Sequence, residues 1–265
     1  MIKNARAPLV QSERWNDYFL LTFEAPGIAR EARPGQFLMI KVSPEPYPLL
    51  RRPLSIHGRS GDAVEVFFKA AGSGTEILSR KKPGETADIL GPLGRGYRLD
   101  GDLRGKKAWC VGGGRGIAPL NFLAEELRAL GAEVRIFYGG RSVEDLPLRD
   151  KFEKRGFPAV CSTDDGTFGF HGFVTDLLEK EGGAAKPDSL YVCGPDAMME
   201  AVAKLSRVWG VPAEFSLESL MGCGIGACWG CVKRIKKEGS EGWVKICEDG
   251  PVFARDEIVW PGDVP

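Results

Sequence analysis

The chain has 265 residues, a length that predicts about two domains. Its hydrophobic content of 43% and charged content of 27% are typical of a globular protein and exclude wholesale disorder. The 36 Lys and Arg residues balance 36 Asp and Glu residues, and no basic cluster of about 5–8 residues is present, so nucleic acid is not an expected partner.

Nothing in the sequence predicts a membrane segment. No stretch approaches the roughly 18 consecutive apolar residues that a spanning helix needs, and residues 1–15 lack the apolar core of a signal peptide. Disulfides are rare in a reducing compartment, so the 7 cysteines of a chain without an export signal require another role. We therefore expect a cytoplasmic protein with no membrane partner.

Residues 1–101 are expected to form the first domain, a small antiparallel β-barrel or sandwich. Short runs rich in β-branched and aromatic residues are separated by Pro-Gly turns, which is typical of such folds. A short helix is expected at 74–80, with Thr75 as its N-cap. The expected strands are 18–23, 37–42, 63–69 and 86–90.

Residues 102–212 are expected to form an α/β domain with a parallel sheet, because strands and helices alternate along them. Residues 213–265 are expected to form a third, smaller unit. The strands of the α/β domain are expected at 107–111, 134–138, 159–162 and 189–193, and its helices at 118–130, 172–180 and 196–209.

Four cysteines gather in the C-terminal part with the spacing C-x4-C-x2-C-x15-C: Cys223, Cys228, Cys231 and Cys247. Plant-type [2Fe-2S] ferredoxins use C-x4-C-x2-C followed by a distant fourth cysteine. The interspersed glycines let the backbone wrap closely and turn N–H groups towards the sulfurs. The alternative is structural zinc, which usually requires two close Cys/His pairs, whereas only one is present here.

A glycine-rich turn, with Gly112, Gly113, Gly114 and Gly116, follows the first strand of the α/β domain and opens a helix. Such a turn presents N–H groups and a positive helix end to a pyrophosphate. It is not the G-x-G-x-x-G fingerprint, and Glu133 precedes the second strand instead of ending it, where a ribose carboxylate belongs. The alternative is that these glycines serve packing alone.

Two other segments follow strands of the same domain. Cys193 ends the fourth strand, at the edge where doubly wound sheets bind ligands, although a cysteine there can simply be a small buried residue. Arg141 and Ser142 follow the second strand, where a 2′-phosphate could be recognised. Glu144 and Asp145 nearby argue against a 2′-phosphate.

In the β domain, a strand entered through Pro53 carries Arg52 three residues before Ser55. An arginine can grip a pyrophosphate with two hydrogen bonds, and a serine hydroxyl can hydrogen-bond a flavin ring. A surface arginine and a strand serine without a ligand are the alternative. The segment 72–75, Gly-Ser-Gly-Thr, is a second possible phosphate cradle.

Taken together, these motifs resemble the ferredoxin-reductase-like flavoproteins, and in particular the electron-transfer subunits of type B dihydroorotate dehydrogenases. The resemblance spans essentially the whole chain. The segments that carry it are 52–55, 72–75, 90–94, 112–119, 162–166, 193–195, 223–231 and 247–253.

The resemblance implies an FAD-binding antiparallel barrel, a parallel-sheet NAD-binding domain and a small C-terminal [2Fe-2S] domain. Lys69 stands where an arginine is expected, and Arg115 where relatives carry a small or apolar residue. Cys193 would lie beside the contact between flavin and nicotinamide and is the candidate catalytic residue. The residues implied to hold FAD are Arg52, Pro53, Leu54, Ser55, Phe67, Phe68, Lys69, Gly74 and Thr75.

The function implied is electron relay from the FMN of a dihydroorotate dehydrogenase catalytic subunit through the cluster and FAD to NAD⁺, in pyrimidine biosynthesis. An α/β barrel for dihydroorotate oxidation needs about 250 residues, and all residues here are already assigned, so the barrel belongs to a partner. The resemblance implies a heterotetramer. The alternatives are a small subunit of an NADPH–ferredoxin oxidoreductase or a hydrogenase γ-subunit, and a non-catalytic redox sensor.

Overall fold

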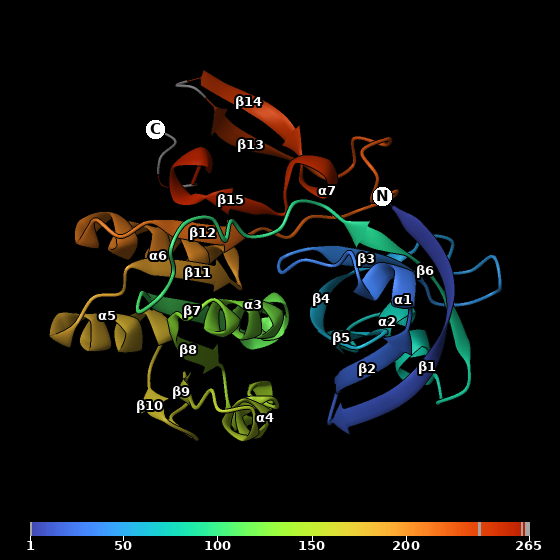
Figure 1. The fold of residues 1–265 in the computed structure, drawn as a ribbon, viewed down its shortest axis with the longest axis horizontal. Coiled ribbons are helices and arrows are strands. Elements are labelled where there is room, and N and C mark those ends of the chain that lie inside the picture. Colours follow the sequence, from blue (N-terminus) through green and yellow to red (C-terminus); the bar gives the residue numbers. More distant parts are fainter. Residues whose placement is uncertain (1, 238–239, 261, 263–265) are drawn as a thin grey trace. The chain divides into compact units, whose positions relative to one another are not determined.

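The computed structural model describes residues 2–237, 240–260 and 262 (Figure 1). The chain divides into two compact units. One contains residues 1–96, 218–233 and 243–251, and the other contains residues 97–217, 234–242 and 252–265. The predicted domains 1–101, 102–212 and 213–265 stay a prediction; in the structure the last of these segments contributes to both units.

The first unit is built on a closed barrel of six antiparallel strands in the order β1-β2-β5-β4-β3-β6. The barrel alternative of the two predicted folds is therefore confirmed. Closure leaves no free sheet edge. The strands are β1 (Lys3–Trp15), β2 (Tyr18–Glu24), β3 (Phe37–Lys41), β4 (Arg52–Ser60), β5 (Ala63–Lys69) and β6 (Thr86–Leu93), with α1 (Pro26–Ala29) and α2 (Ser73–Ser79) between them.

Sequence analysis missed β1, and it was wrong about Thr75. Along β1 buried and exposed positions are mixed, so that the strand lacks the apolar run that marks β2. Helix α2 begins with Gly72 as its N-cap, and Thr75 lies three residues inside it. The Thr75 hydroxyl accepts hydrogen bonds from the N–H groups of Ala71 and Gly72, at 3.0 and 3.2 Å. Thr75 therefore stabilises the start of the helix from a position inside it.

The second unit contains a seven-stranded sheet in the order β10-β9-β8-β7-β11-β12-β15. The first six strands are parallel, and β15 pairs antiparallel with β12 at one edge. The chain runs outward from β7 through β8 and β9, and it crosses back to β11 on the other side. The strands are β7 (Lys107–Gly113), β8 (Glu133–Gly140), β9 (Ala159–Thr163), β10 (Phe170–His171), β11 (Ser189–Cys193), β12 (Ala213–Ser216) and β15 (Val252–Ala254).

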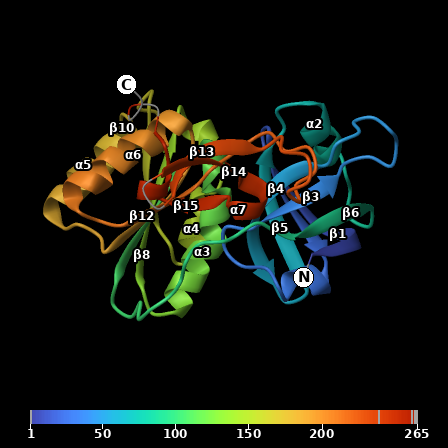
Figure 2. The ribbon, with the colours of Figure 1, turned by 90° about the horizontal axis from the view of Figure 1, so that it is seen from above.

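Helices cover both faces of this sheet. Figure 2 shows α3 and α4 on one face and α5 and α6 on the other, as right-handed crossovers in opposite directions require. Buried aromatic rings, among them Trp109, Phe122 and Phe137, fill the layers between helices and sheet. The helices are α3 (Ala118–Ala129), α4 (Arg149–Lys154), α5 (Val174–Ala184) and α6 (Asp196–Trp209), with 3₁₀ turns at Gly114–Ile117, Val143–Asp145 and Arg255–Glu257.

The predicted parallel strands and helices of the α/β domain are confirmed, with shifts of a few residues at their ends. Sequence analysis missed β10, β12, β15 and α4, which are short. The C-terminal segment adds β13 (Val232–Lys237) and β14 (Ser240–Lys245), which form a two-stranded sheet, and α7 (Ile246–Asp249).

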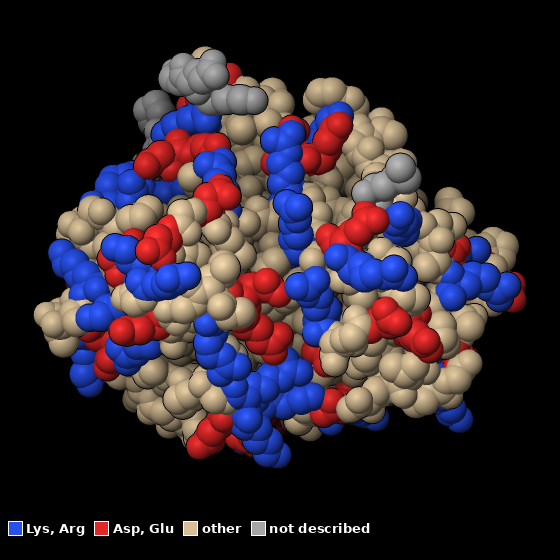
Figure 3. Space-filling model, viewed as in Figure 1, with Lys and Arg blue, Asp and Glu red and all other residues tan. Residues whose placement is uncertain are grey.

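Acidic and basic side chains are both spread over the face shown in Figure 3, in keeping with a formal net charge of zero. In the part of the chain that the structure describes, no helix combines the length and the apolar character needed to cross a bilayer.

Glu214 on β12 gives the second unit a pH-dependent stability. Burial, with help from the nearby carboxylates of Glu257 and Asp100, raises its pKa from 4.5 to about 7, against the opposing effect of Arg98. When folding raises the pKa of an acid, the free energy of unfolding falls as the pH rises from the pKa of the unfolded state to that of the folded state. Here that window runs from about pH 4.5 to about pH 7, and the full cost is about 3 kcal/mol.

We expect Glu214→Gln to remove this cost. The amide can still accept the hydrogen bond that the Arg98 N–H donates at 3.1 Å. Thermal unfolding of both proteins should show nearly equal stability at pH 4.5 and a variant that is more stable by about 3 kcal/mol at pH 8. An unchanged pH dependence in the variant would contradict the assignment.

Candidate functional site

The four clustered cysteines all lie in the first compact unit, on the loop before β13 and on α7. Cys231 and Cys247 are buried, Cys223 is partly exposed and Cys228 is exposed. The fold therefore brings together cysteines that lie up to 24 positions apart in the sequence. One contact that joins the two segments is the hydrogen bond from the Ile246 N–H to the Cys231 carbonyl, at 3.1 Å.

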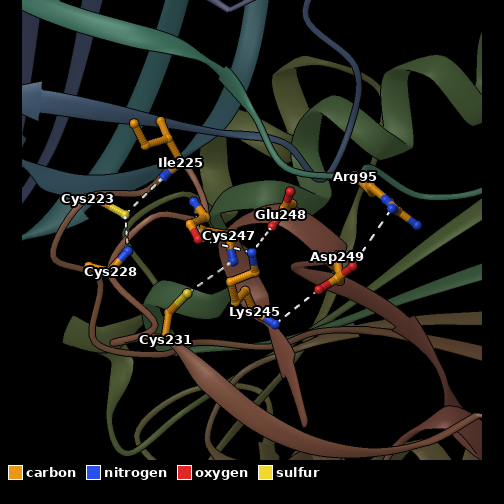
Figure 4. A network of polar contacts seen from close by, with 10 residues as sticks. Arg95, Cys223, Ile225, Cys228, Cys231, Lys245, Cys247, Glu248 and Asp249 are labelled. Carbon is orange, nitrogen blue, oxygen red and sulfur yellow. Dashed lines mark hydrogen bonds and ion pairs between the residues drawn. The ribbon is translucent and has the colours of Figure 1, made fainter. Parts of the chain in front are cut away.

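Backbone N–H groups point at these thiols, as the sequence predicted (Figure 4). The shortest contact is from the Gly226 N–H to the Cys247 sulfur, at 3.1 Å. Hydrogen bonds of this kind stabilise thiolates and the negative charge of an iron–sulfur cluster. The other contacts run from Ile225 and Cys228 to Cys223 at 3.5 and 3.4 Å, from Gly230 to Cys228 at 3.4 Å, and from Cys247 to Cys231 at 3.5 Å.

The loop conformation explains its glycines. Gly224 and Gly226 have φ angles of 74° and 81°, which L-residues rarely adopt, and a Cβ atom on Gly224 would overlap the Met39 side chain. Trp229 has a φ of 55° although it is not a glycine, which costs roughly 1–2 kcal/mol of strain. The backbone is thus bent around the sulfurs at a local cost in stability.

The electrostatics of the thiols differ. Burial raises the pKa of Cys223, but the N–H groups of Ile225 and Cys228 outweigh it, so the pKa falls to about 7. Burial, and then the neighbouring Cys231 thiol, raise the pKa of Cys247 to about 12. A bound metal centre would supply the positive charge that holds Cys247 as a thiolate at neutral pH.

The cysteine spacing, with a single close pair at Cys228 and Cys231, favours an iron–sulfur cluster over structural zinc. A [2Fe-2S] cluster distributes its four thiolates over two irons. The donor set and its N–H groups fit such a cluster.

A second candidate site opens in the barrel where β4 and β5 separate. These strands pair from Ser60↔Ala63 as far as Ile56↔Val66, and the ladder then stops. Beyond that point residues 52–55 pair only with β3, and residues 67–69 pair only with β2. Both predicted FAD-binding strand segments are therefore the diverging ends of one hairpin. Each of the residues Arg52, Pro53, Leu54 and Ser55 is partly exposed there.

The predicted phosphate cradle lies at the same opening. A Cβ atom on Gly74 would overlap the Arg52 guanidinium, so this side chain lies directly over the start of α2. The guanidinium is held there by a hydrogen bond to the Leu50 carbonyl. Sequence analysis selected Arg52 and Gly74 separately, and the structure brings them together.

The aromatic residues of β5 at this site are packed against β2. Phe67 and Phe68 are 2% and 3% exposed, and they stack on Tyr18 and Phe19 with ring centroids 5.6 and 5.7 Å apart. Lys69 lies with its ammonium 4.7 Å from the Tyr18 ring centroid. Because the Phe67 and Phe68 side chains are buried, a ligand can contact only the backbone of residues 67–69 and the Lys69 ammonium here.

In the second unit, the glycine-rich turn and Cys193 lie side by side. Cys193 pairs with Gly112 in the β7–β11 ladder, at the point where the strand order reverses. Ligands of open α/β sheets bind in the crevice outside the carboxyl ends of the strands at such a point. Cys193 is 2% exposed, so its side chain is buried in this structure.

Three of the four predicted NAD-binding glycines are required for packing. A Cβ atom would overlap Ile117 if placed on Gly112, Met198 if placed on Gly113, and the Cys193 carbonyl oxygen if placed on Gly116. Gly114 instead has open space around it and a φ of 53°. Close packing thus requires a glycine at these three positions, and the turn that they allow brings the two loops together; NAD binding at all four positions stays a prediction.

We expect Gly116→Ala to destabilise the protein by about 3 kcal/mol, because the backbone of Cys193 and Gly194 must move. Gly114→Ala is the matched control and should cost only about 1 kcal/mol, from its left-handed φ. Chemical denaturation of both variants tests the difference. Equal losses would show that close packing at Gly116 is not what fixes the turn.

The residues at the end of β8 include those that could distinguish NAD from NADP. Arg141, which could recognise a 2′-phosphate, forms an ion pair with Asp145, with Nε 2.8 Å from Oδ2. A carboxylate at this place engages the arginine and repels a further phosphate. The arrangement therefore favours NAD over NADP.

Sequence analysis missed two charged residues beside the cysteines, Lys245 and Glu248. Lys245 donates from Nζ to the Gly226 carbonyl at 3.0 Å and forms an ion pair with Glu248. The only signal in the sequence is their spacing of three around Cys247, which is typical of any exposed helical turn.

Two family models match segments of the chain that contain the cysteine cluster and the nucleotide turn. The family model described as the iron–sulfur cluster binding domain of dihydroorotate dehydrogenase B matches residues 218–259, and the oxidoreductase NAD-binding domain matches residues 110–204. Together with the ferredoxin-reductase-like fold, these domains support the predicted cofactors FAD, [2Fe-2S] and NAD.

Among curated proteins, the chain is 40% identical over 247 residues to the dihydroorotate dehydrogenase B (NAD(+)), electron transfer subunit, of Desulforamulus reducens. That match covers 92% of this chain and 93% of the relative. The corresponding subunit of Geobacillus thermodenitrificans is 41% identical, with 90% of this chain and 91% of the relative covered.

Among solved structures, an NADH-dependent reduced ferredoxin-NADP oxidoreductase matches with a TM-score of 0.83 and 30% identity, over 97% of this chain and 91% of that one. A ferredoxin NADP⁺ reductase from Neisseria gonorrhoeae shares the fold alone, with a TM-score of 0.65 and 18% identity over 78% of this chain and 92% of that one. By its whole-length identity to the curated relatives, the chain belongs to the family of dihydroorotate dehydrogenase B (NAD⁺) electron-transfer subunits.

Proposed function

We propose that this electron-transfer subunit relays electrons from the FMN of a dihydroorotate dehydrogenase catalytic subunit through a [2Fe-2S] cluster and FAD to NAD⁺. The observation that supports this most strongly is the set of backbone N–H groups aimed at four cysteine sulfurs. The cluster supplies one-electron transfer, and the flavin supplies the step between single electrons and hydride. The proposed cluster ligands are Cys223, Cys228, Cys231 and Cys247.

FAD is proposed to bind where β4 and β5 diverge. Arg52 lies over the start of α2 with its guanidinium fixed, an arrangement suited to a pyrophosphate. Ser55 carries a hydroxyl at the same opening and could hydrogen-bond the edge of a flavin ring. Pro53, Leu54, the 67–69 backbone, Gly74 and Thr75 are proposed to complete the site.

NAD is proposed to bind at the β7–β11 edge, against the turn that contains Gly112, Gly113, Gly114 and Gly116. Gly114 is the position whose Cα has open space, so a nucleotide can approach the backbone there. Cys193 is proposed to adjoin the contact between nicotinamide and flavin. Because its thiol is buried, that role requires the side chain to become accessible when the nucleotide binds.

The relatives are named as electron-transfer subunits. Such a subunit needs a catalytic partner that supplies the electrons. We propose that this partner carries FMN and that two copies of each chain form a heterotetramer. The cytoplasmic location expected from the sequence stays a prediction.

The test is to co-purify the chain with its native partners and to assay reduction of NAD⁺ by dihydroorotate. The account predicts turnover in the complex and none in the isolated chain, which should still reduce an artificial dye with NADH. If the chain lacks NADH–dye activity, the redox-sensor alternative is favoured. Dye activity with NADPH in place of NADH would favour an NADPH–ferredoxin oxidoreductase subunit.

A further inference from the structure

Lys245 makes three contacts within the cysteine segment, and Figure 4 shows it close to Cys247, Glu248 and Asp249. Its ammonium donates a hydrogen bond to the Gly226 carbonyl at 3.0 Å, forms an ion pair with Glu248 and lies 5.0 Å from the ring centroid of Trp229. The Lys245 side chain is only 20% exposed. A charged side chain with three partners in the segment that carries the cysteines requires an explanation beyond solubility.

Gly226 is where this contact acts on the sulfurs. Its N–H makes the shortest backbone contact to a cysteine, 3.1 Å from the Cys247 sulfur, while its carbonyl accepts from Lys245. The N–H of Ala227, in the same peptide group as that carbonyl, helps to lower the pKa of the Cys223 thiol. When a charged group donates to the carbonyl of a peptide group, the N–H of that same peptide group becomes a stronger hydrogen-bond donor. Lys245 therefore polarises the Ala227 N–H, and through the Gly226 carbonyl it holds in place the residue whose N–H donates to Cys247.

The charges of this pair act directly as well. Reduction adds one electron to a cluster, so a nearby positive charge favours the reduced form and a nearby negative charge opposes it. The Lys245 side chain is 20% exposed and that of Glu248 is 52% exposed, and the Glu248 carboxylate lies where a Cβ atom on Gly226 would be. The remaining carboxylate here, Asp249, accepts from the Lys245 backbone N–H at 3.0 Å and lies 3.8 Å from Arg95.

We propose that Lys245 is a positioning residue of the cluster. It holds Gly226 against Cys247 and raises the reduction potential of the cluster, and Glu248 lowers that potential by opposing the lysine charge. This inference rests on the proposed function only in that the four cysteines hold a [2Fe-2S] cluster.

The experiment is a redox titration of the full-length chain, followed by the electron paramagnetic resonance signal of the reduced cluster. Lys245→Gln should shift the midpoint potential to more negative values, and Glu248→Gln should shift it to more positive values. Lys245→Arg keeps the charge and should stay close to wild type. Lys204→Gln is the matched control, since Lys204 forms an ion pair with Glu200 at 2.7 Å on α6, in the other compact unit, and its removal should leave the potential unchanged.

Opposite shifts distinguish a charge effect from simple damage, which would move both variants in the same direction. If Lys245→Gln fails to retain the cluster, Glu248→Gln decides alone, and an unchanged potential in that variant overturns the inference. A wild-type chain with no [2Fe-2S] signal would instead refute the proposed function. A normal signal with equal potentials in all variants would refute only the role of Lys245 and Glu248.

Discussion

Replacing Cys228 with serine is expected to abolish dihydroorotate-dependent NAD⁺ reduction by the complex while NADH-dependent dye reduction stays near the wild-type rate. Cys228 is the exposed member of the four cysteines, and the Gly230 N–H donates to its sulfur at 3.4 Å. Loss of one thiolate removes a cluster ligand, whereas the proposed FAD and NAD sites lie on other elements. The two activities, measured on the same preparation, test the order of the relay.

Cys161→Ser is the control for this variant. Cys161 is a buried cysteine on β9 whose thiol donates to the Ala159 carbonyl at 3.5 Å, a hydrogen bond that a serine can also make. This variant should retain both activities. If Cys228→Ser instead lost both activities with FAD still bound, the cluster would not lie between the partner and the flavin.

The second large effect is expected for Arg52→Ala, which should release FAD from the purified chain. A hydrogen bond between charged groups contributes about 1.5–3 kcal/mol, so the affinity for FAD should fall about 10- to 150-fold. Arg52→Lys should give an intermediate affinity, since the lysine ammonium keeps the positive charge but lacks the planar set of N–H donors of a guanidinium. Bound flavin, measured by absorbance after gel filtration against a series of FAD concentrations, provides the comparison.

Arg59→Ala serves as the matched control, because Arg59 is an exposed arginine on the same strand, at the end where β4 still pairs with β5. It should retain FAD with wild-type affinity. Equal flavin loss in both variants would show that the divergence of β4 and β5 is not the flavin site.

The sequence predicted those parts of the fold that depend on local patterns. The runs 63–69 and 189–193 are apolar and β-branched, and both form strands. Strand β1 was missed because its register is set by pairing with β2 and β6, which its own mixed pattern does not reveal. Thr75 was misplaced because any hydroxyl near a helix start resembles an N-cap.

The candidate sites were predictable to the extent that covalent spacing defines them. The cysteine spacing indicated a [2Fe-2S] cluster at once, since few other metal centres use it. The contact of Arg52 with Gly74, the packing of Gly116 on Cys193, and the contact of Lys245 with Gly226 join residues whose proximity depends on the fold. The glycines of the nucleotide turn illustrate this, since the sequence pattern does not reveal the side chains and backbone against which three of them pack.

The central claim is that one cluster, held by these four cysteines, carries the electrons between the two flavins. The most direct measurement is the reduced-cluster signal in the co-purified complex when dihydroorotate is added without NAD⁺. The account predicts that the [2Fe-2S] signal appears in the wild-type complex, is absent with Cys228→Ser, and decays when NAD⁺ is supplied. A cluster that stays oxidised while the same complex reduces NAD⁺ with dihydroorotate would contradict it.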